Sequence, residues 1–479
     1  MITIFKIPIR KHQLLLVIGD LLIITLLIPV SFYIRGFYRH VELIDFILQL
    51  FPRLFIILQD YTVASSTLIF IYISIFYIGE LYSLERNYRR FFELLRIAIL
   101  VILAMGIISV FYYLGPHWRM GRGIFGIHAL LTWVCISLWR FVYSLIKPRI
   151  IALRNILIIG AGMVGRTLAE EMQKNFSSLY RIIGFIDDDP AKQNIMISGI
   201  PVLGAGKDIN RIASENKIDI IIFAILHRAT EVNGLLIKSI LDLKAKGINV
   251  FEMPTFYKKV TGKIPVKCIE DVWLLFSQKF LGGSRIEEKN IKRLADVWIS
   301  AFSLAVLSPI FLIVTLLIKL TSKGPVFYKQ ERVGLDKKPY QLFKFRTMIA
   351  NAEESGPVWA TRNDPRATLL GRFLRRTRLD EVPQFINVLK GDMSIVGPRP
   401  ERPNFVEMLE QYIPYYSLRF SAKPGLTGWA QVNYQYGASV EDAHIKLQYD
   451  LYYIQEMSIL LDFIIMLKTL QTIFLHRGS

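Results

Sequence analysis

The sequence predicts a membrane protein with three parts: a four-helix transmembrane bundle, a Rossmann-like α/β domain, and a mixed α/β C-terminal domain that begins with a re-entrant membrane helix. Hydrophobic residues make up 53% of the chain and the mean hydropathy is +0.38, which is too apolar for an ordinary water-soluble protein. A glycine-rich turn at 155–165 indicates the α/β domain, and a Ser-Pro pair inside the apolar segment 295–318 indicates the re-entrant helix. We expect these parts at 1–150, 151–260 and 291–479, with a linker at 261–290.

The composition narrows the class of protein further. A formal net charge of +19 is compatible with nucleic-acid binding, but in a membrane protein it is better explained by cytoplasmic loops, anionic lipid headgroups and phosphate substrates. The two cysteines, Cys135 and Cys268, lie far apart in the sequence, so neither a disulfide framework nor a cysteine metal site is expected. The first apolar segment continues past signal-peptide length without a small-residue cleavage site, so we expect no cleavable signal peptide.

Four apolar segments, near 13–34, 59–79, 92–115 and 124–146, are each long enough to cross the hydrocarbon core as a helix. Basic residues are more numerous on one side of the expected bundle than on the other, which favours both of its ends on the cytoplasmic side. The expected cytoplasmic set is Lys6, Arg10, Lys11, Arg86, Arg89, Arg90, Lys147, Arg149 and Arg154; the opposite set is Arg35, Arg39, Arg53, Arg119 and Arg122. Asp20, within the first span, is expected to be a helix-packing contact.

The α/β domain is predicted from a strand, a glycine-rich turn and a helix in direct succession. Residues 155–165 read NILIIGAGMVG, and the turn contains Gly160, Gly162 and Gly165. A second strand ends at Asp187, about 20 residues further on, as in dinucleotide-binding folds. The alternation of strands and helices then continues to about 260, which indicates a parallel sheet. The glycines and Asp187 are candidates for nucleotide binding, but the glycines can equally serve tight turning and close helix packing alone.

The apolar segment 295–318 is long enough to span a membrane, yet two features argue for a re-entrant helix. Both of its flanks are basic, and Ser308-Pro309 falls past its middle, where proline removes a backbone hydrogen bond and serine can satisfy the freed groups. A helix that enters one leaflet, breaks there and returns would keep the rest of the chain on the cytoplasmic face. An ordinary kinked span is the alternative.

The segment 376–400 contains the strongest candidate active site. Its adjacent carboxylates Asp380 and Glu381 are surrounded in sequence by arginines, an arrangement suited to a polyanionic phosphate substrate. The arginines are Arg375, Arg376, Arg378 and Arg399, and a predicted hairpin upstream adds Arg332, Lys344 and Arg346, with the last two expected on one strand face. We expect Asp380 to cap a short helix that contains Pro383 and ends at Gly391.

Adjacent helical residues point about 100° apart, so Asp380 and Glu381 are expected to have different roles. For chemistry on a pyrophosphate, one carboxylate would be the nucleophile and the other a ligand of Mg²⁺, an ion that takes oxygen ligands and bridges phosphates. The alternative is that the two residues only cap and stabilise a helix.

Three motifs carry a family resemblance: KFRTM at 344–348, RRTRLDEVPQFINVLKGDMSIVGPRP at 375–400 and KPGLTGWAQV at 423–432. Together with the apolar Ser-Pro segment, they closely resemble the bacterial polyprenyl-phosphate hexose-1-phosphate transferases, the large monotopic phosphoglycosyl transferases that initiate exopolysaccharide, capsule and O-antigen synthesis. The resemblance extends over the whole chain, from the four spans to the catalytic domain.

The resemblance implies that Asp380 attacks the sugar-bearing phosphate of a UDP-sugar, giving an aspartyl-phosphosugar intermediate and UMP, after which undecaprenyl phosphate accepts the phosphosugar. It implies that Glu381 is an Mg²⁺ ligand and that Lys344, Arg375 and Arg399 contact phosphates; the phosphate role of Arg332, Arg346 and Arg378 is our own inference. The expected location is the bacterial cytoplasmic membrane, with glucose or galactose as the sugar. The chain has surface enough for a homodimer.

The sequence leaves two alternative functions open. A membrane-bound nucleotide-sugar dehydratase or epimerase would need a Tyr-x-x-x-Lys helix, but Tyr340 and Lys344 have that spacing in a strand-like segment with no glycine-rich loop upstream. A non-catalytic membrane sensor of nucleotides would not need the carboxylates and arginines. The C-terminal segment 457–477 is expected to form an amphipathic helix on the membrane or against the domain, and Trp429 an interfacial anchor or a core residue.

Overall fold

The computed structural model describes residues 2–4, 7–9, 11–36, 50–82, 91–114, 121–150, 153–177, 179–225, 234–269, 273–274, 286–322, 324–349, 364–434, 437 and 439–474. The chain divides into two compact units, one formed by residues 1–4 and 8–152 and the other by 5–7 and 153–479. Residues 270–272 and 275–285 of the expected linker lie outside the described residues.

The first unit is a helical bundle with an apolar core. Leu16, Leu68, Tyr72 and Ala104 are fully buried where the helices meet. Its elements are β1 (Ile2–Ile4), β2 (Ile7–Ile9), α1 (Lys11–Ile34), α3 (Leu50–Asp60), α4 (Thr62–Ile78), α5 (Phe91–Leu114) and α6 (Arg122–Ile150).

One buried ion pair links the first and last helices of this bundle. Arg140 of α6 donates to the carboxylate of Asp20 in α1, and both side chains are completely buried. Two opposite charges that meet in this way avoid the cost of a lone charge in an apolar interior. Asp20 therefore has the helix-packing role expected from the sequence.

Four helices among the described residues are long and apolar enough to cross a membrane: Gln13–Ile34, Glu93–Tyr113, Arg122–Ile146 and Lys289–Thr321. Three of them match expected spans. The expected span at 59–79 instead folds as the 17-residue helix α4, because the chain turns at Tyr61 and splits the apolar region into α3 and α4.

The basic residues used to orient the bundle are only partly described. Lys6, Arg10, Arg39, Arg86, Arg89, Arg90 and Arg119 lie outside the described residues. The cytoplasmic orientation of the bundle ends therefore stays a prediction from the sequence.

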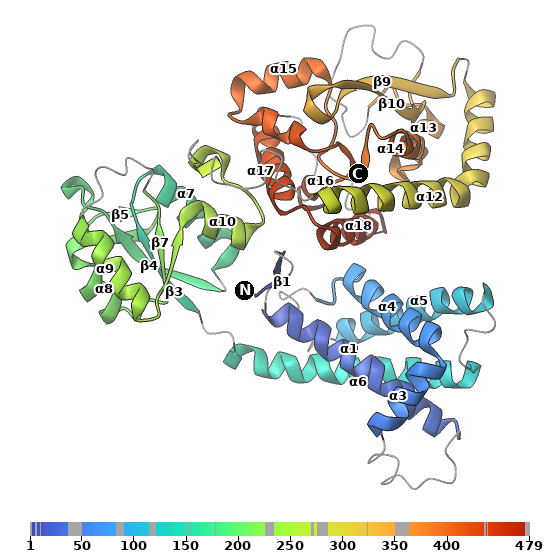
Figure 1. Cartoon of the computed structure of the whole chain (residues 1–479), viewed down its shortest axis with the longest axis horizontal. Coiled ribbons are helices and arrows are strands. Elements are labelled where there is room, and N and C mark those ends of the chain that lie inside the picture. Colours follow the sequence, from blue (N-terminus) through green and yellow to red (C-terminus); the bar gives the residue numbers. More distant parts are fainter. Residues whose placement is uncertain are drawn as a thin grey trace. The chain divides into compact units, whose positions relative to one another are not determined.

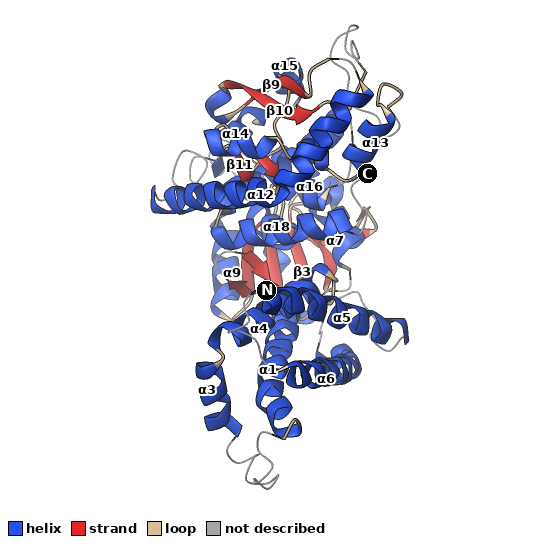
Figure 2. Cartoon of the chain, turned by 90° about the vertical axis from the view of Figure 1, so that its right-hand side faces the viewer, coloured by secondary structure: helices blue, strands red, loops and turns tan. Residues whose placement is uncertain are grey.

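The second unit begins with a Rossmann-like domain. Its six-stranded sheet has the order β5-β6-β4-β3-β7-β8, and all neighbours are parallel except the short β5–β6 pair. Helices α7 and α10 cover one face, and α8 and α9 the other (Figures 1 and 2). The elements are β3 (Arg154–Ile159), α7 (Met163–Phe176), β4 (Tyr180–Ile186), β5 (Met196–Ile197), β6 (Ile200–Gly204), α8 (Ile209–Glu215), β7 (Ile220–Phe223), α9 (Gly234–Ala245), β8 (Asn249–Glu252) and α10 (Met253–Thr261).

A long helix, α12 (Ile286–Thr321), leads into the C-terminal domain and is sharply bent (Figure 1). Pro309 lies inside it and has no N–H to donate to the carbonyl of Ala305, four residues earlier. The hydroxyl of Ser308 donates to that same carbonyl at 2.8 Å. The Ser-Pro pair thus both removes a backbone hydrogen bond and replaces it, which lets the helix bend without leaving the Ala305 carbonyl unsatisfied.

The second half of α12 packs directly on the segments that carry the candidate site. Val314 and Ile318 are buried against Phe345, Leu374 and Val382. The opposite side of the helix exposes large apolar side chains, namely Leu312, Ile313, Leu316 and Leu320. The helix therefore holds the candidate site with one face and offers an apolar surface with the other.

The C-terminal domain contains the expected antiparallel hairpin, with Lys344 paired to Tyr328. A second, parallel pair joins β11 to β12. The elements after α12 are β9 (Phe327–Val333), β10 (Pro339–Phe345), α13 (Leu369–Arg376), the 3-10 turn η6 (Leu379–Glu381), α14 (Gln384–Lys390), β11 (Ser394–Val396), α15 (Pro403–Tyr412), the 3-10 helix η7 (Tyr416–Ser421), β12 (Gly425–Thr427), α16 (Trp429–Asn433), α17 (Val440–Glu456) and α18 (Ile459–Phe474).

The final helix and Trp429 both pack within this unit. Leu461 and Ile465 of α18 are fully buried, and the indole N–H of Trp429 donates to the carbonyl of Gly262 at 2.9 Å. Ile264 N–H also donates to the carbonyl of Gln448 in α17 at 3.0 Å. The start of the segment expected to be a linker is therefore ordered and attached to the C-terminal domain.

Candidate active site

The two carboxylates lie in a tight turn that follows a residue in the left-handed region. Arg378 has φ +60° and precedes η6, which contains Asp380 and Glu381. The next helix, α14, begins at Gln384 after Pro383 and has no side-chain cap. Our expectation that Asp380 caps this helix is therefore wrong: the 3-10 turn separates Asp380 from the helix by three residues. Gly391 ends α14 with φ +96°, as expected.

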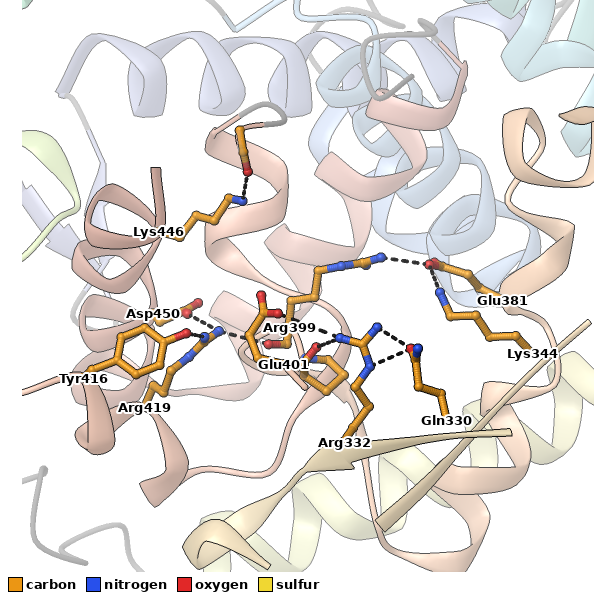
Figure 3. Close-up of polar contacts among 12 residues, drawn as sticks. Gln330, Arg332, Lys344, Glu381, Arg399, Glu401, Tyr416, Arg419, Lys446 and Asp450 are labelled. Atoms are coloured by element: carbon orange, nitrogen blue, oxygen red, sulfur yellow. Dashed lines mark hydrogen bonds and ion pairs between the residues drawn. The ribbon is translucent and has the colours of Figure 1, made fainter. Parts of the chain in front are cut away.

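Glu381 is the carboxylate that the basic residues contact. Its Oε1 accepts from Lys344 Nζ at 3.1 Å and from Arg399 Nη2 at 3.1 Å (Figure 3). The three residues come from β10, η6 and the segment after β11, so the fold assembles the site from positions up to 55 apart in sequence. The sequence predicted this grouping of two cations and a carboxylate.

Burial opposes the ionisation of Glu381, but the positive charges of Lys344, Arg399 and Arg378 hold the pKa of its carboxyl well below the ordinary value. Its charge is therefore present throughout the physiological range.

Asp380 is only 7% exposed and behaves differently. Burial raises the pKa of its carboxyl from 3.8 to about 6, and the neighbouring charge of Glu381 adds to the rise, whereas Lys344, Arg375 and Arg378 oppose it. At neutral pH both residues are ionised, but Asp380 is the more basic of the two. The pair thus has two distinct electrostatic characters, which fits the different roles expected from the sequence.

The other candidate cations have different positions. Arg375 donates from Nε to the hydroxyl of Thr347 at 2.9 Å and is close enough to lower the pKa of Asp380. Arg346 donates instead to the carbonyl and hydroxyl of Ser322, at the end of α12. The expectation that Arg346 shares the site with Lys344 is not met, because the strand ends at Phe345 and the next side chain turns back to the helix.

Arg332 is also directed away from Glu381. Its guanidinium donates to Gln330 Oε1 at 3.0 Å from Nε and 2.6 Å from Nη2, and to the carbonyl of Pro400 at 2.9 Å (Figure 3). It also pairs with the carboxylate of Glu401 at 3.8 Å, so its printed partners lie next to Arg399 and do not include Asp380 or Glu381.

Two groups of residues that sequence reasoning missed support the site. Asn387 is fully buried, and its side-chain amide forms two hydrogen bonds with the backbone of β10. It accepts from Phe343 N–H at 2.9 Å and donates to the carbonyl of Gln341 at 2.7 Å. Arg419 and Asp450 form a buried pair beside Arg399. Their only sequence signal was polar residues within apolar helical segments, since their partners lie 31 or more residues away.

The middle-domain candidates form a second, self-contained group. Asp187 accepts from the backbone N–H of Ala161 at 2.8 Å and of Asp189 at 3.0 Å, and Lys192 lies 3.3 Å away. Gly160 has φ +101°, and a Cβ at Gly165 would lie 2.0 Å from the Gly160 carbonyl oxygen. A Cβ at Gly162 would meet no atom within 4 Å. Turning and helix packing account for Gly160 and Gly165, but they do not account for Gly162.

The carboxylates suit a hard divalent cation only in part. No group of three or more His, Cys, Asp or Glu side chains that could hold a metal ion occurs among the described residues. Mg²⁺ is commonly held by one or two carboxylates together with substrate phosphates, so Asp380 and Glu381 fit an ion that arrives with its phosphate substrate.

The model for the bacterial sugar transferase family matches residues 287–476, which include nearly all of α12, both candidate carboxylates and the cations around them. A UDP-glucose:undecaprenyl-phosphate glucose-1-phosphate transferase from Caulobacter vibrioides is 42% identical over 186 residues, covering 38% of this chain and 69% of that protein. The chain belongs to the bacterial sugar transferase family.

Two further relatives show how far the similarity of this chain extends, and the chain spans less than two thirds of the length of each. A UDP-N-acetylgalactosamine-undecaprenyl-phosphate N-acetylgalactosaminephosphotransferase from Aeromonas hydrophila is 43% identical over 189 residues, covering 40% of the chain but only 45% of the relative. An undecaprenyl-phosphate glucose phosphotransferase from Komagataeibacter xylinus is 30% identical over 338 residues, covering 68% of the chain and 60% of the relative. The chain also matches a CoA-binding domain model over residues 78–243.

Proposed function

We propose that this sugar transferase moves a hexose-1-phosphate from a UDP-sugar to undecaprenyl phosphate, releases UMP, and thereby performs the first membrane step of exopolysaccharide, capsule or O-antigen synthesis. The observation that carries the proposal is the division of roles at η6. Glu381 is surrounded by Lys344 and Arg399, whereas Asp380 is the more basic neighbour. This transfer requires a nucleophile and a set of cations that bind the phosphate.

In the first step a carboxylate oxygen of Asp380 attacks the phosphorus that carries the sugar. The bond from that phosphorus to the bridging oxygen breaks, and UMP leaves with the electron pair. In the second step a phosphate oxygen of undecaprenyl phosphate attacks the same phosphorus, the bond to Asp380 breaks, and the carboxylate is regenerated. Both steps conserve charge without a proton donor, because the leaving groups are a phosphate and a carboxylate.

The basic residues contribute by stabilising the charge of the transferring phosphate. Lys344 and Arg399 reach Glu381 through long side chains, which can turn to a phosphate oxygen when the substrate arrives. Arg375 and Arg378 are close enough to influence Asp380 and would contact the same substrate. Glu381 would hold Mg²⁺, which when bound supplies further neutralisation of the phosphate charge.

The geometry of α12 supports a re-entrant attachment to the cytoplasmic face of the inner membrane. The bend, the Ser308 bond to the Ala305 carbonyl and the packing of the second half of the helix on the site all fit a helix that enters and leaves one leaflet. Both substrates could then reach η6, the UDP-sugar from water and undecaprenyl phosphate from the lipid.

Replacement of Asp380 tests the proposal most directly. With membrane-embedded enzyme, UDP-glucose or UDP-N-acetylgalactosamine, Mg²⁺ and undecaprenyl phosphate, Asp380→Asn is expected to reduce UMP release by at least about 10³-fold, because the amide cannot form the covalent intermediate. Mass spectrometry of the wild type should show a phosphosugar on the peptide that contains Asp380. UMP release that survives the substitution would exclude Asp380 as the nucleophile.

The topology is tested by labelling with an impermeant thiol reagent in intact cells. Lys323, beside the end of α12, lies outside the described residues, so the exposed Lys338 in the hairpin turn is a better position. A cysteine at Lys338 is expected to remain unlabelled from outside, whereas one at Arg122, on the expected external side, should react. Labelling at position 338 would restore the spanning alternative.

No observation favours the dehydratase or epimerase alternative. Lys344 lies in β10 and contacts Glu381, so it is not the lysine of a Tyr-x-x-x-Lys helix. A sensor without catalysis would leave the grouping of Asp380, Glu381 and two cations without a purpose.

A further inference from the structure

Two arginines hold consecutive backbone carbonyls in the segment that carries Arg399. Arg419, in η7, donates from Nη2 to the carbonyl oxygen of Arg399 at 2.9 Å. Arg332, in β9, donates from Nη1 to the carbonyl oxygen of Pro400 at 2.9 Å. Figure 3 shows the two guanidiniums converging on this segment from separate elements, while the side chain of Arg399 extends toward Glu381. The backbone beneath Arg399 is therefore fixed at two adjacent points.

Arg419 is itself held in one orientation. Asp450, in α17, accepts from its Nη2 at 2.9 Å, and the hydroxyl of Tyr416 accepts from its Nη1. Arg419 is 6% exposed and Asp450 is 1% exposed. Desolvation makes a pair this deeply buried a weak source of stability, so its contribution is better sought in the geometry that it imposes.

Arg332 is fixed in a similar way. Two of its nitrogens donate to Gln330 Oε1, and the N–H of the next residue, Val333, donates to the carbonyl of Glu401 at 2.9 Å. The chain from Arg399 to Glu401 is thus attached to β9 on one side and to η7 and α17 on the other.

We propose that Arg419, oriented by Asp450, and Arg332 are positioning residues that aim Arg399 at the transferring phosphate. This inference rests on the proposed function, because it assumes that Arg399 contacts that phosphate. Arg399 reaches Glu381 through a flexible side chain that is 36% exposed, so the backbone anchor is the rigid part of its placement. Loss of the anchor would spread Arg399 over more conformations and lower the fraction that reaches the phosphate.

A double-mutant cycle on the full-length enzyme in nanodiscs tests the assignment. Asp450→Asn is expected to reduce kcat/KM about 10-fold, and Arg399→Ala by about 10² or more. If Asp450 acts through Arg399, adding Asp450→Asn to Arg399→Ala should change kcat/KM by less than about 2-fold, whereas independent effects would multiply. Multiplied effects, or an unchanged rate in Asp450→Asn, would overturn the proposal.

A matched control and a milder variant separate positioning from simple loss of stability. Glu456→Gln neutralises another carboxylate of α17, one that pairs with Lys258 of α10 at 2.9 Å, and it should leave kcat/KM within about 2-fold. Tyr416→Phe removes one acceptor of Arg419 and keeps its charge partner, so it should fold normally and show a smaller loss that also disappears with Arg399→Ala. A loss in Glu456→Gln equal to that in Asp450→Asn would contradict the proposal.

The outcomes also distinguish this inference from the proposed function. A wild-type enzyme that transfers no sugar phosphate would refute the proposed function. An active wild type with an equally active Asp450→Asn variant would refute the positioning role alone.

Discussion

The second unit contains two acidic centres that differ in the donors that hold them. At the end of β4, Asp187 accepts hydrogen bonds from the backbone N–H groups of Ala161 and Asp189, and also from one side chain, that of Lys192. At η6, Glu381 accepts from the side chains of Lys344 and Arg399. Both carboxylates lie near a turn that contains a strained or glycine backbone, and sequence reasoning selected both as candidates for binding phosphate-containing ligands.

The difference lies in what a ligand could displace. Backbone donors cannot leave Asp187 unless the glycine turn unfolds, whereas lysine and arginine side chains can rotate from Glu381 to a phosphate oxygen. A carboxylate held by its own backbone belongs to the architecture of the fold. A carboxylate held by mobile cations has partners ready for an anionic substrate.

The largest difference between Glu381 and Asp187 is expected when each is replaced by its isosteric amide. Glu381→Gln should reduce UMP release about 10²- to 10³-fold, because it removes the charge that organises Lys344 and Arg399. Asp187→Asn should leave the rate within about 3-fold, since its partners Ala161, Asp189 and Lys192 all lie within the middle domain. Steady-state rates of both purified variants provide the measurement. A collapse of activity in Asp187→Asn would show that the middle domain takes part in the reaction.

Two glycines of the middle-domain turn should differ in how much an alanine substitution destabilises the fold. Gly165→Ala should destabilise the enzyme by about 3 kcal/mol, because the new Cβ would collide with the Gly160 carbonyl. Gly162→Ala should change stability by only about 1 kcal/mol, since the space there is open. Thermal unfolding in detergent measures both.

Nucleotide binding by the middle domain stays a prediction, and Gly162→Val examines it in the same background. Nucleotide binding that is lost in this variant while folding is retained would assign a ligand role to the turn. Unaltered binding would argue that the glycines serve only the fold.

Asp380 should show the opposite pH behaviour to a carboxylate that stabilises the fold. Its pKa is raised from 3.8 to about 6, so the folded protein favours the protonated form, and this contribution to stability is present below about pH 4 and lost as the pH rises through 6. At pH 8, Asp380→Asn should therefore raise the free energy of unfolding by about 2 kcal/mol, with little difference at pH 4. Unfolding curves of the wild type and of Asp380→Asn at pH 4 and pH 8 measure this difference in stability, and an Asn variant that is less stable at pH 8 would contradict the prediction.

The transfer rate of the wild type should also fall as the pH drops below about 6.

The smallest effect on stability is expected at Ser308, whose hydroxyl replaces the backbone N–H that Pro309 lacks. Ser308→Ala should cost about 1 kcal/mol, because the Ala305 carbonyl loses the hydroxyl that satisfies it beside Pro309. The double variant Ser308→Ala with Pro309→Ala should regain most of this loss, since the backbone N–H returns. Melting temperatures in lipid provide the measurement, and failure of the double variant to recover would mean that the bend itself contributes stability.

The sequence predicted those features that depend on local patterns. The glycine turn, the hairpin that carries Lys344 and the helix end at Gly391 each follow from the conformational limits of a few adjacent residues. The meeting of Lys344, Glu381 and Arg399 was predicted from motif resemblance and charge.

The hydrogen-bond partners of the long basic side chains could not be predicted from local patterns. Arg346 and Arg332 looked equivalent to Lys344 in the sequence, yet they bind Ser322 and Pro400. An arginine can satisfy its donors on any carbonyl within its reach, so its partner is decided by tertiary packing and not by neighbouring residues. The pairing of Arg419 with Asp450 was missed for the same reason.

Asn387 shows how a single amide can set the alignment of an active site. It bonds the carbonyl of Gln341 and the N–H of Phe343, the same two groups that a neighbouring strand would engage. The side chain thus takes the place of one residue of a neighbouring strand, and its two hydrogen bonds fix the position of β10 along α14. A slip by one residue would point a phenylalanine ring at Glu381 and force Lys344 into the apolar cluster of Phe311, Phe327 and Phe345.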